Sequence, residues 1–425
     1  MRVFIVMALL LFGTVGMGQA KTQIELWFPP GNQIAENMQP TVDRFNAAHP
    51  DIEAVLVHRD PAPAALLAAA AGDVAPNVIF GAHSWSPTYA ANGLLLDLWP
   101  FIIRDGLEAE YQSDFFPGAL VTGNTYRGQL VGLPMLLQIE ALYYQPEIFD
   151  RSGIAVPDEG WTWDDFAQIA QRMTRIEGDG SVSVYGAGST TAQNMAILFL
   201  MQHGATIWDE ETYTSTVNQP EFREGIEQLR DLAERNVVYM GQDVHLPSNT
   251  IRDAFLAGNV GIQQDGTYRL PLIEAQNPDA RVLPLPRRSP DADPVTMLTL
   301  RNVNILRSRD AAKEQASWTF VKWLMEPENL AQTSVDISAL GGRPSLIEQP
   351  VYAEYIARSP HLSAFASLLA PYSTGVGFTG IPGRDDIFNQ GFTPLTVGAL
   401  RGDLPVPAYI DQLHQIVDQI LAEYR

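Results

Sequence analysis

Strand-like and helix-like segments alternate over residues 22–93, and this order restricts the fold more than any other feature of the sequence. Apolar runs of strand length are followed by segments in which apolar residues recur at helical spacing. Strict alternation of this kind is typical of a parallel sheet covered by helices, so we predict an α/β protein. Pro40 lies inside the first helical pattern and predicts a kink or a late start. The expected strands are 22–28, 52–57 and 77–80, and the expected helices are 34–45, 64–71 and 86–92.

Length and composition indicate more than one folded unit. The chain has 425 residues, of which 46% are hydrophobic and 18% charged, so two domains with separate cores are expected. The formal net charge of −22 disfavours binding to nucleic acid or to an anionic membrane surface. It does not exclude an anionic ligand, because one local arginine can override a distant field. The absence of cysteine excludes disulfides, a thiol nucleophile and thiolate metal sites.

The first 20 residues have the pattern of a cleavable signal peptide. Arg2 precedes an apolar run over residues 3–12, and Gly18 and Ala20 occupy the −3 and −1 positions before Lys21. A buried first helix or a membrane anchor is the alternative, but the apolar run is too short to span a bilayer. We predict a signal peptide over residues 1–20. Since no cysteine is available to carry a lipid, the exported protein is predicted to be a soluble periplasmic protein.

A long apolar segment over residues 128–144 precedes the best-marked helix start of the chain. Thr162 is followed three residues later by Asp165, which is the spacing of a capping box. Further helices are expected to begin at or near Ser248 and Ser308. Other expected elements are a strand at 182–188, a strand pair or ladder at 297–306, helices at 194–203 and 221–236, and a terminal helix over 410–421.

Motifs of common enzymes are absent. The sequence contains no nucleophile elbow, zinc-protease helix, phosphate-binding loop or dinucleotide fingerprint, and its seven histidines lack metal-ligand spacing. The acidic pairs 164–165 and 385–386 would allow a hydrolytic dyad. Adjacent carboxylates more often mark a helix N-terminus, and the capping box explains the first pair. Catalysis is therefore disfavoured, and these residues predict no metal site.

Several motifs, in their order along the chain, resemble family 1 extracellular solute-binding proteins of ABC transporters. Asn77 replaces the aspartate that is usual in one motif, Asn259 a lysine in another, and Tyr268 a tryptophan. The similarity covers nearly the whole chain after residue 20. The matching stretches are RFNAAHPDIEAVLV, GDVAPNVIFGAHSW, YAANGLLLDL, DAFLAGNVGIQQDGTYRL, KEQASWTFVKWLMEPE and the loop 341–345.

This resemblance implies a two-lobed periplasmic-binding-protein fold of type II, as in maltose-binding protein. Each lobe would be a mixed sheet flanked by helices, and the chain would cross between the lobes three times. The first crossing is expected at Gly132–Pro134, and 283–286 resembles a return strand. The implied division is 21–133 with 284–325 for lobe 1, and 134–283 with 326–425 for lobe 2.

The same resemblance implies a function in import. A monomeric protein would capture a carbohydrate in the interlobe cleft by hinge closure and deliver it to the transmembrane subunits of an ABC permease. Because such a protein only binds and delivers, no cofactor is implied. A glycerol-phosphate-type ligand is the alternative within the family, because Arg343 and Arg384 would be able to neutralise a phosphate. A secreted carbohydrate-active enzyme is the alternative from another class.

Four candidate binding residues are identified by their position at or after the ends of predicted strands. Trp27 ends the first strand, and His83, Ser84 and Trp85 follow the third. Ligands of open α/β sheets bind at the carboxyl ends of strands, where aromatic rings can stack on a sugar. A core position is an equally good reading for Trp27. By resemblance, the remaining candidates are Asn32, Gln138, Glu140, Trp208, Asp265, Tyr268, Asn302, Asn304 and Arg343.

Overall fold

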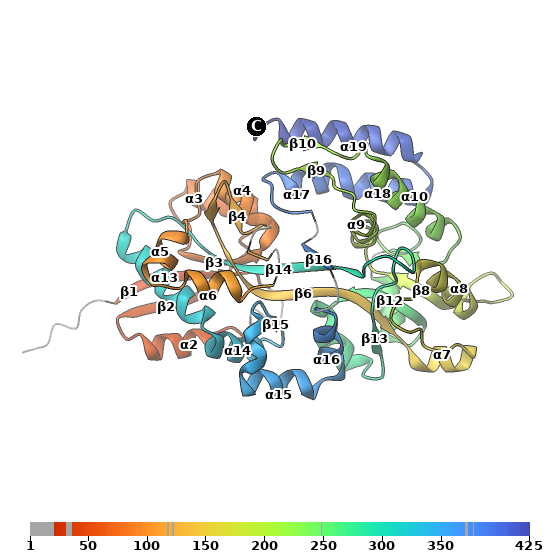
Figure 1. Cartoon of the computed structure of the whole chain (residues 1–425), viewed down its shortest axis with the longest axis horizontal. Coiled ribbons are helices and arrows are strands. Elements are labelled where there is room, and N and C mark those ends of the chain that lie inside the picture. Colours follow the sequence, from red (N-terminus) through yellow and green to blue (C-terminus); the bar gives the residue numbers. More distant parts are fainter. Residues whose placement is uncertain are drawn as a thin grey trace, which may run out of the picture.

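A computed structural model describes residues 21–30, 36–116, 119–120, 123–247, 249–369, 373–376 and 378–425. It consists of two α/β halves, which meet along two long strands that run across the middle of the molecule (Figure 1). The predicted signal peptide over residues 1–20 and the predicted cap Ser248 lie outside the described residues. No helix in the described part of the chain is long and apolar enough to cross a membrane.

The first half confirms the parallel α/β pattern read from the sequence. Strand β1 (Thr22–Phe28) pairs in parallel with β2 (Ile52–His58) and with β3 (Val78–Ala82). Helix α2 begins late, at Gln39, with Pro40 in its first turn, where the missing N–H of proline costs no hydrogen bond. The other helices of this region are α3 (Pro63–Ala71), α4 (Ser86–Ala91), α5 (Trp99–Arg104) and α6 (Glu108–Ser113).

Two strands belong to both halves. Strand β14 (Val295–Ile305) lies antiparallel to β3 and to β6 (Leu133–Tyr144), so the strand pair or ladder expected at 297–306 is one long strand that forms ladders on both sides. Strand β6 pairs with β14 up to Ile139 and with β12 (Val260–Gly266) from Glu140 onward. The first crossing therefore lies several residues beyond Gly132–Pro134, because the chain crosses inside a strand. The main sheet has the order β11-β8-β12-β6-β14-β3-β1-β2.

The second half is built on β12 and β8 (Val182–Ser189), which pair in parallel. Helix α8 (Trp163–Met173) covers β8 and begins with the predicted capping box of Thr162 and Asp165. The C-terminal helices α18 (Thr393–Arg401) and α19 (Val406–Leu421) pack on α10 (Pro220–Glu234). Other elements here are α7 (Pro146–Ser152), α9 (Ala192–Gln202), α11 (Thr250–Leu256), α12 (Leu270–Gln276), β11 (Tyr239–Met240) and β13 (Arg281–Leu283).

Helices near the end of the chain return to the first half. Helix α13 (Ala311–Met325) packs on β1 and is capped by Asp310, whose side chain accepts from Ala312 N at 2.9 Å, and not by Ser308 as predicted. Helix α14 (Pro327–Asp336) packs on α2, where Arg44 Nη1 meets Asp336 Oδ2 at 2.7 Å. This packing differs from the predicted division, which assigned residues from 326 onward to the second lobe. Helices α15 (Pro350–Arg358) and α16 (Pro360–Ser367) follow, below the long strands in Figure 1.

Candidate ligand cavity between the two halves

A cavity of about 420 Å³ lies where the two halves meet. This volume is in the range of small-molecule sites, and the walls come from both halves of the chain. The 3₁₀ turn η1 (His83–Trp85) forms one wall. Strands β6 and β14, which join the two halves, contribute further side chains, and α9 and the C-terminal region close the other side. The lining residues are Ala82, His83, Ser84, Trp85, Gln138, Glu140, Gln193, Asn194, Ile197, Tyr268, Met297, Leu298, Thr299, Thr379, Arg384, Asp385, Phe388 and Asn389.

His83 supplies a polar edge that the surrounding protein leaves unpaired. Its Nδ1 lies 3.1 Å from Leu300 N and 3.0 Å from Leu300 O, which fixes the ring against β14. Burial lowers the pKa of His83 to about 3, so the ring is neutral at physiological pH. Its Nε2 is buried and has no hydrogen-bond partner among the described residues. A buried polar atom of this kind carries an unmet hydrogen bond that a ligand can satisfy.

The indole of Trp85 lies against β3 because residue 81 is glycine. A Cβ at Gly81 would stand 3.0 Å from Trp85 Cε3, which is closer than side chains normally pack. The indole remains partly exposed and lines the cavity. An aromatic ring in this position offers an apolar surface on which a pyranose can stack.

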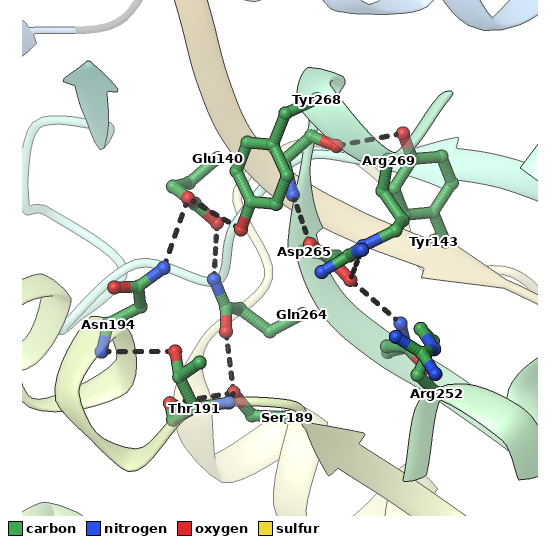
Figure 2. A network of polar contacts seen from close by, with 12 residues as sticks. Glu140, Tyr143, Ser189, Thr191, Asn194, Arg252, Gln264, Asp265, Tyr268 and Arg269 are labelled. Atoms are coloured by element: carbon green, nitrogen blue, oxygen red, sulfur yellow. Dashed lines mark hydrogen bonds and ion pairs between the residues drawn. The ribbon is translucent and has the colours of Figure 1, made fainter. Parts of the chain in front are cut away.

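Glu140 is the centre of a buried polar network at the point where β6 changes partners (Figure 2). The carboxylate is 1% exposed. Oε2 accepts from Gln264 Nε2 at 2.5 Å, while Oε1 accepts from the Tyr268 hydroxyl at 3.2 Å and lies 3.4 Å from Asn194 Nδ2. These partners come from β12, η2 (Thr267–Arg269) and the first turn of α9. The network therefore ties the floor of the cavity to the second half.

Burial and the neighbouring Asp265 raise the pKa of Glu140 to about 8. Glu140 consequently carries a proton over most of the physiological pH range. Burial also raises the pKa of Asp265, although Arg269 Nε at 3.3 Å partly offsets that effect. Asp265 is fully buried and accepts from Gln263 Nε2 at 3.0 Å, so it lies behind the wall and not among the lining residues.

Arg384 contributes a cationic side chain to the cavity lining, and the neighbouring Asp385 carboxylate neutralises its charge. Its Nη1 lies 2.9 Å from Asp385 Oδ1, and its guanidinium carbon lies 3.7 Å from the centroid of the Phe388 ring. Its Nε donates to the carbonyl of Phe378 at 3.2 Å. Helix α17 (Arg384–Ile387) and the π-helix η4 (Phe388–Phe392) hold these side chains over the cavity.

The structure brings together six of the predicted site residues: His83, Ser84, Trp85, Gln138, Glu140 and Tyr268 line the same cavity. Asn302 and Asn304 are buried beside it, and each donates from Nδ2 to the hydroxyl of Ser86, at 3.1 and 3.0 Å. Asn32 lies outside the described residues.

Three other predicted residues are not among those that line the cavity. Trp27 is fully buried in a core cluster with Leu66 and Tyr89, because its side chain faces the helix layer and not the sheet edge. Trp208 is buried in the core of the second half. Arg343 is 2% exposed and lies 2.6 Å from carboxylate oxygens of both Glu110 and Asp114. The structure thus gives these three side chains packing or ion-pairing roles.

Residues from α9 and from the C-terminal region were missed as cavity-lining candidates. Gln193 and Asn194 lie in the first turn of α9, whose N-cap Thr191 accepts from Asn194 N. A capped helix start after a buried strand was the available signal, since such starts often face ligands in α/β folds. The others are Ile197, Thr379, Asp385, Phe388 and Asn389 from these two regions, and Ala82, Met297, Leu298 and Thr299 from β3 and β14.

Residues 41–360 match the model of a family described as bacterial extracellular solute-binding protein, and the chain belongs to this family. Over 327 residues it is 23% identical to the maltotriose-binding protein of Pyrococcus abyssi (strain GE5 / Orsay), an alignment that covers 75% of this chain and 67% of the relative. Among solved structures it resembles UgpB from Mycobacterium tuberculosis in complex with glycerophosphocholine, with a TM-score of 0.78 and 17% identity over 95% of this chain and 100% of that one.

A second solved structure is similar to the same degree. The cyclic alpha-maltosyl-1,6-maltose binding protein of Arthrobacter globiformis matches with a TM-score of 0.77 and 21% identity, over 95% of this chain and 100% of that one. These likenesses confirm the predicted fold, which is the two-lobed binding-protein fold of type II. The family consists of binding proteins, in agreement with the absence of enzyme motifs from the sequence.

Proposed function

We propose that this protein is the periplasmic substrate-binding component of an ABC importer and that it captures a neutral carbohydrate in the cavity between its halves. Family membership supports the transport role. The observation that carries the ligand class is the balance of charge in the cavity. Glu140 holds its proton, His83 is neutral, and Arg384 is paired with Asp385. A lining that combines aromatic rings, amides and hydroxyls without net charge suits a polyol.

The balance of charge in the cavity also argues against a glycerol-phosphate-type ligand, which relatives and structural neighbours of this chain bind. A phosphate needs cationic donors that are free to form charge-assisted hydrogen bonds. Arg384 has its own carboxylate at 2.9 Å, and Arg343 is held by two carboxylates away from the cavity. A phosphate in this cavity would therefore have to compete with existing ion pairs.

Capture proceeds by closure of one half on the other. The cavity has walls from both halves, so a ligand makes its full set of contacts only when the halves are together. The closed protein then docks as a monomer on the transmembrane subunits of the permease. The role needs no cofactor, and the net charge of −22 disfavours nucleic acid as a partner.

A secreted carbohydrate-active enzyme is the second candidate, because two carboxyl groups, Glu140 and Asp385, line the cavity. A raised pKa such as that of Glu140 is typical of a general acid. However, both of its carboxyl oxygens are engaged by protein donors, and Asp385 is paired with Arg384. Neither group is poised for attack on a glycosidic bond, so we favour binding without turnover.

A ligand panel tests this function. The purified protein is screened by thermal shift against neutral oligosaccharides, such as maltotriose and mannotriose, and against glycerophosphodiesters, and the best binder is confirmed by calorimetry. Neutral saccharides are expected to raise the melting temperature, since a ligand that binds only the folded state stabilises it. Stabilisation by phosphorylated compounds alone would contradict the carbohydrate assignment. Recovery of a cleaved saccharide after incubation would contradict a pure binding role.

A further inference from the structure

A second cavity, of about 820 Å³, opens beside the first and is lined by both halves and by the end of the chain. We call it the outer cavity. The first half contributes the hairpin of β4 (Thr125–Tyr126) and β5 (Gln129–Leu130), and the second contributes the turn between β9 (Trp208–Asp209) and β10 (Thr214–Ser215). Its lining residues are Thr125, Tyr126, Arg127, Gly128, Glu210, Glu211, Thr212, Tyr213, Gly380, Tyr424 and Arg425.

Three tyrosines from three separate segments meet at the outer cavity: Tyr126, Tyr213 and Tyr424. Tyr126 is largely buried, whereas Tyr213 and Tyr424 are partly exposed. Tyrosine combines a flat apolar ring with a hydroxyl, and such rings are suited to stacking on sugars while the hydroxyl forms hydrogen bonds. Glu210 and Glu211 add acceptors for ligand hydroxyls, and Arg127 and Arg425 add donors.

The backbone holds two of these side chains in place at a conformational cost. Arg127 and Tyr213 have φ angles of 46° and 54°, in the left-handed region that bulky residues rarely adopt. Arg425 Nε donates to Tyr213 O at 3.0 Å, and Arg127 Nη2 donates to Tyr424 O at 3.3 Å. The second of these bonds joins the first half to the C-terminus. For Arg127 the hairpin itself enforces the conformation, because Arg127 and Gly128 form the two-residue turn between β4 and β5, a turn that requires positive φ at both residues.

One segment of chain contributes neighbouring residues to the outer cavity and to the cavity described above. Thr379 lines the inner cavity and its neighbour Gly380 lines the outer one. Gly380 has a φ of 95°, a backbone conformation that favours glycine, and a Cβ at this position would overlap the Glu210 carboxylate, which also lines the outer cavity. Thr379 Oγ1 is buried and has no hydrogen-bond partner among the described residues. Farther along the segment, Gly383 N donates a hydrogen bond to Thr88 Oγ1 of the first half at 3.3 Å.

We propose that the outer cavity is a second saccharide subsite, which holds the distal units of an oligosaccharide whose other end lies in the inner cavity. The proposal rests on the proposed function. It assigns a chain length to the ligand class, because a ligand that reaches the outer cavity must be longer than one that fills the inner cavity. Thr379, whose hydroxyl has no partner in the described part of the chain, is the residue that such a ligand passes.

Chain-length dependence of affinity tests this inference. Wild-type protein, Tyr213→Ala and Tyr424→Ala are titrated by calorimetry with a series of maltodextrins and a series of manno-oligosaccharides, each from the disaccharide to the heptasaccharide. Wild-type affinity is expected to rise with length within the series that binds. Each variant should lose about 3- to 10-fold for the longest saccharide and remain unchanged for the shortest one bound, as expected for loss of one aromatic contact.

Unchanged binding of the shortest saccharide also shows that the variant is folded. Tyr185→Ala, which removes a partly buried ring outside both cavities, is the matched control and should not alter the length dependence. Affinity that is independent of length in the wild type, or equal losses for short and long saccharides, overturns the second subsite and leaves the proposed function standing. Failure of every saccharide to bind the wild type overturns both.

Discussion

The hydroxyl of Tyr268 donates a hydrogen bond to Oε1 of Glu140 at 3.2 Å, across 128 positions of sequence. Glu140 is the first residue of β6 to pair with β12, and Tyr268 belongs to the turn that directly follows β12. The bond therefore links the joint between the halves to the wall of the cavity. Both residues line that cavity, so a substitution at either should change the affinity for the ligand.

Removal of aromatic rings from the inner cavity should weaken binding without unfolding the protein. Trp85→Ala and Tyr268→Ala are each expected to lower the affinity for a bound saccharide by about 10-fold or more, because each loses a stacking surface. Calorimetry measures the affinity, and the melting temperature of the free protein reports on folding. Trp99→Ala, which removes a partly buried indole on α5, is the control. Unchanged affinity in both cavity variants would show that the ligand binds elsewhere.

The ionisation of Glu140 should make stability depend on pH. Because burial raises the pKa of Glu140 to about 8, the folded protein binds a proton that the unfolded chain releases near its ordinary value of 4.5. This contribution to stability is complete below pH 4.5 and is lost as the pH rises toward 8. Glu140→Gln, which is neutral at every pH, should therefore be more stable relative to wild type at pH 8 than at pH 5.

Urea denaturation at the two pH values measures this difference. Glu147→Gln is the control, since Glu147 is 81% exposed on α7 and lies 3.6 Å from Arg151, a long separation for an ion pair. If the stability difference between Glu140→Gln and wild type is the same at pH 5 and pH 8, Glu140 is ionised in the folded protein at both pH values.

Arg343 should contribute to stability and not to binding. Arg343→Ala removes the buried cation beside Glu110 and Asp114, whose side chains are 44% and 16% exposed, and is expected to lower the free energy of unfolding by about 1.5–3 kcal/mol through the loss of charge-assisted hydrogen bonds. Arg151→Ala removes a surface pair and should change the free energy of unfolding by about 0–1 kcal/mol. Chemical denaturation measures both. A loss of ligand affinity in folded Arg343→Ala would restore the role predicted from the sequence.

The close packing of α8 on β8 depends on a glycine. A Cβ at Gly186 would overlap the carbonyl of Ala170, so Gly186→Ala should force the helix from the strand and destabilise the protein by more than about 3 kcal/mol. Gly178→Ala is the control, because no atom lies within 4 Å of the added Cβ. Thermal unfolding compares the two, and equal melting temperatures would indicate that α8 moves away at little cost.

Local features of the fold were readable from the sequence because neighbours along the chain determine them. Thr162 and Asp165 form their capping box within one helical turn, and the alternation of β1, α2 and β2 follows from the apolar pattern alone. The cavity walls at His83 and Trp85 were also found, since strand ends locate the edge of a parallel sheet.

Features that depend on distant partners were not readable. The sequence does not reveal which face of β1 carries Trp27, and the structure turns it toward α3. Arg343 has the charge expected of a ligand-binding residue, but its partners Glu110 and Asp114 lie more than 200 positions away. Their approach depends on tertiary packing between segments far apart in the chain, which local patterns do not encode.

The joint of β6 and β14 has a mechanical consequence. Two adjacent strands held by a ladder between residues 133–139 and 298–303 resist sliding, because sliding would break backbone hydrogen bonds, whereas a change in their twist keeps every bond. Opening of the two halves is then a rotation of one half relative to the other, in which the backbone hydrogen bonds between β6 and β14 are kept. Its free-energy cost resides in side-chain and loop contacts such as that of Gly383 with Thr88. Amide protons along this ladder should accordingly exchange with solvent equally slowly whether the ligand is bound or absent.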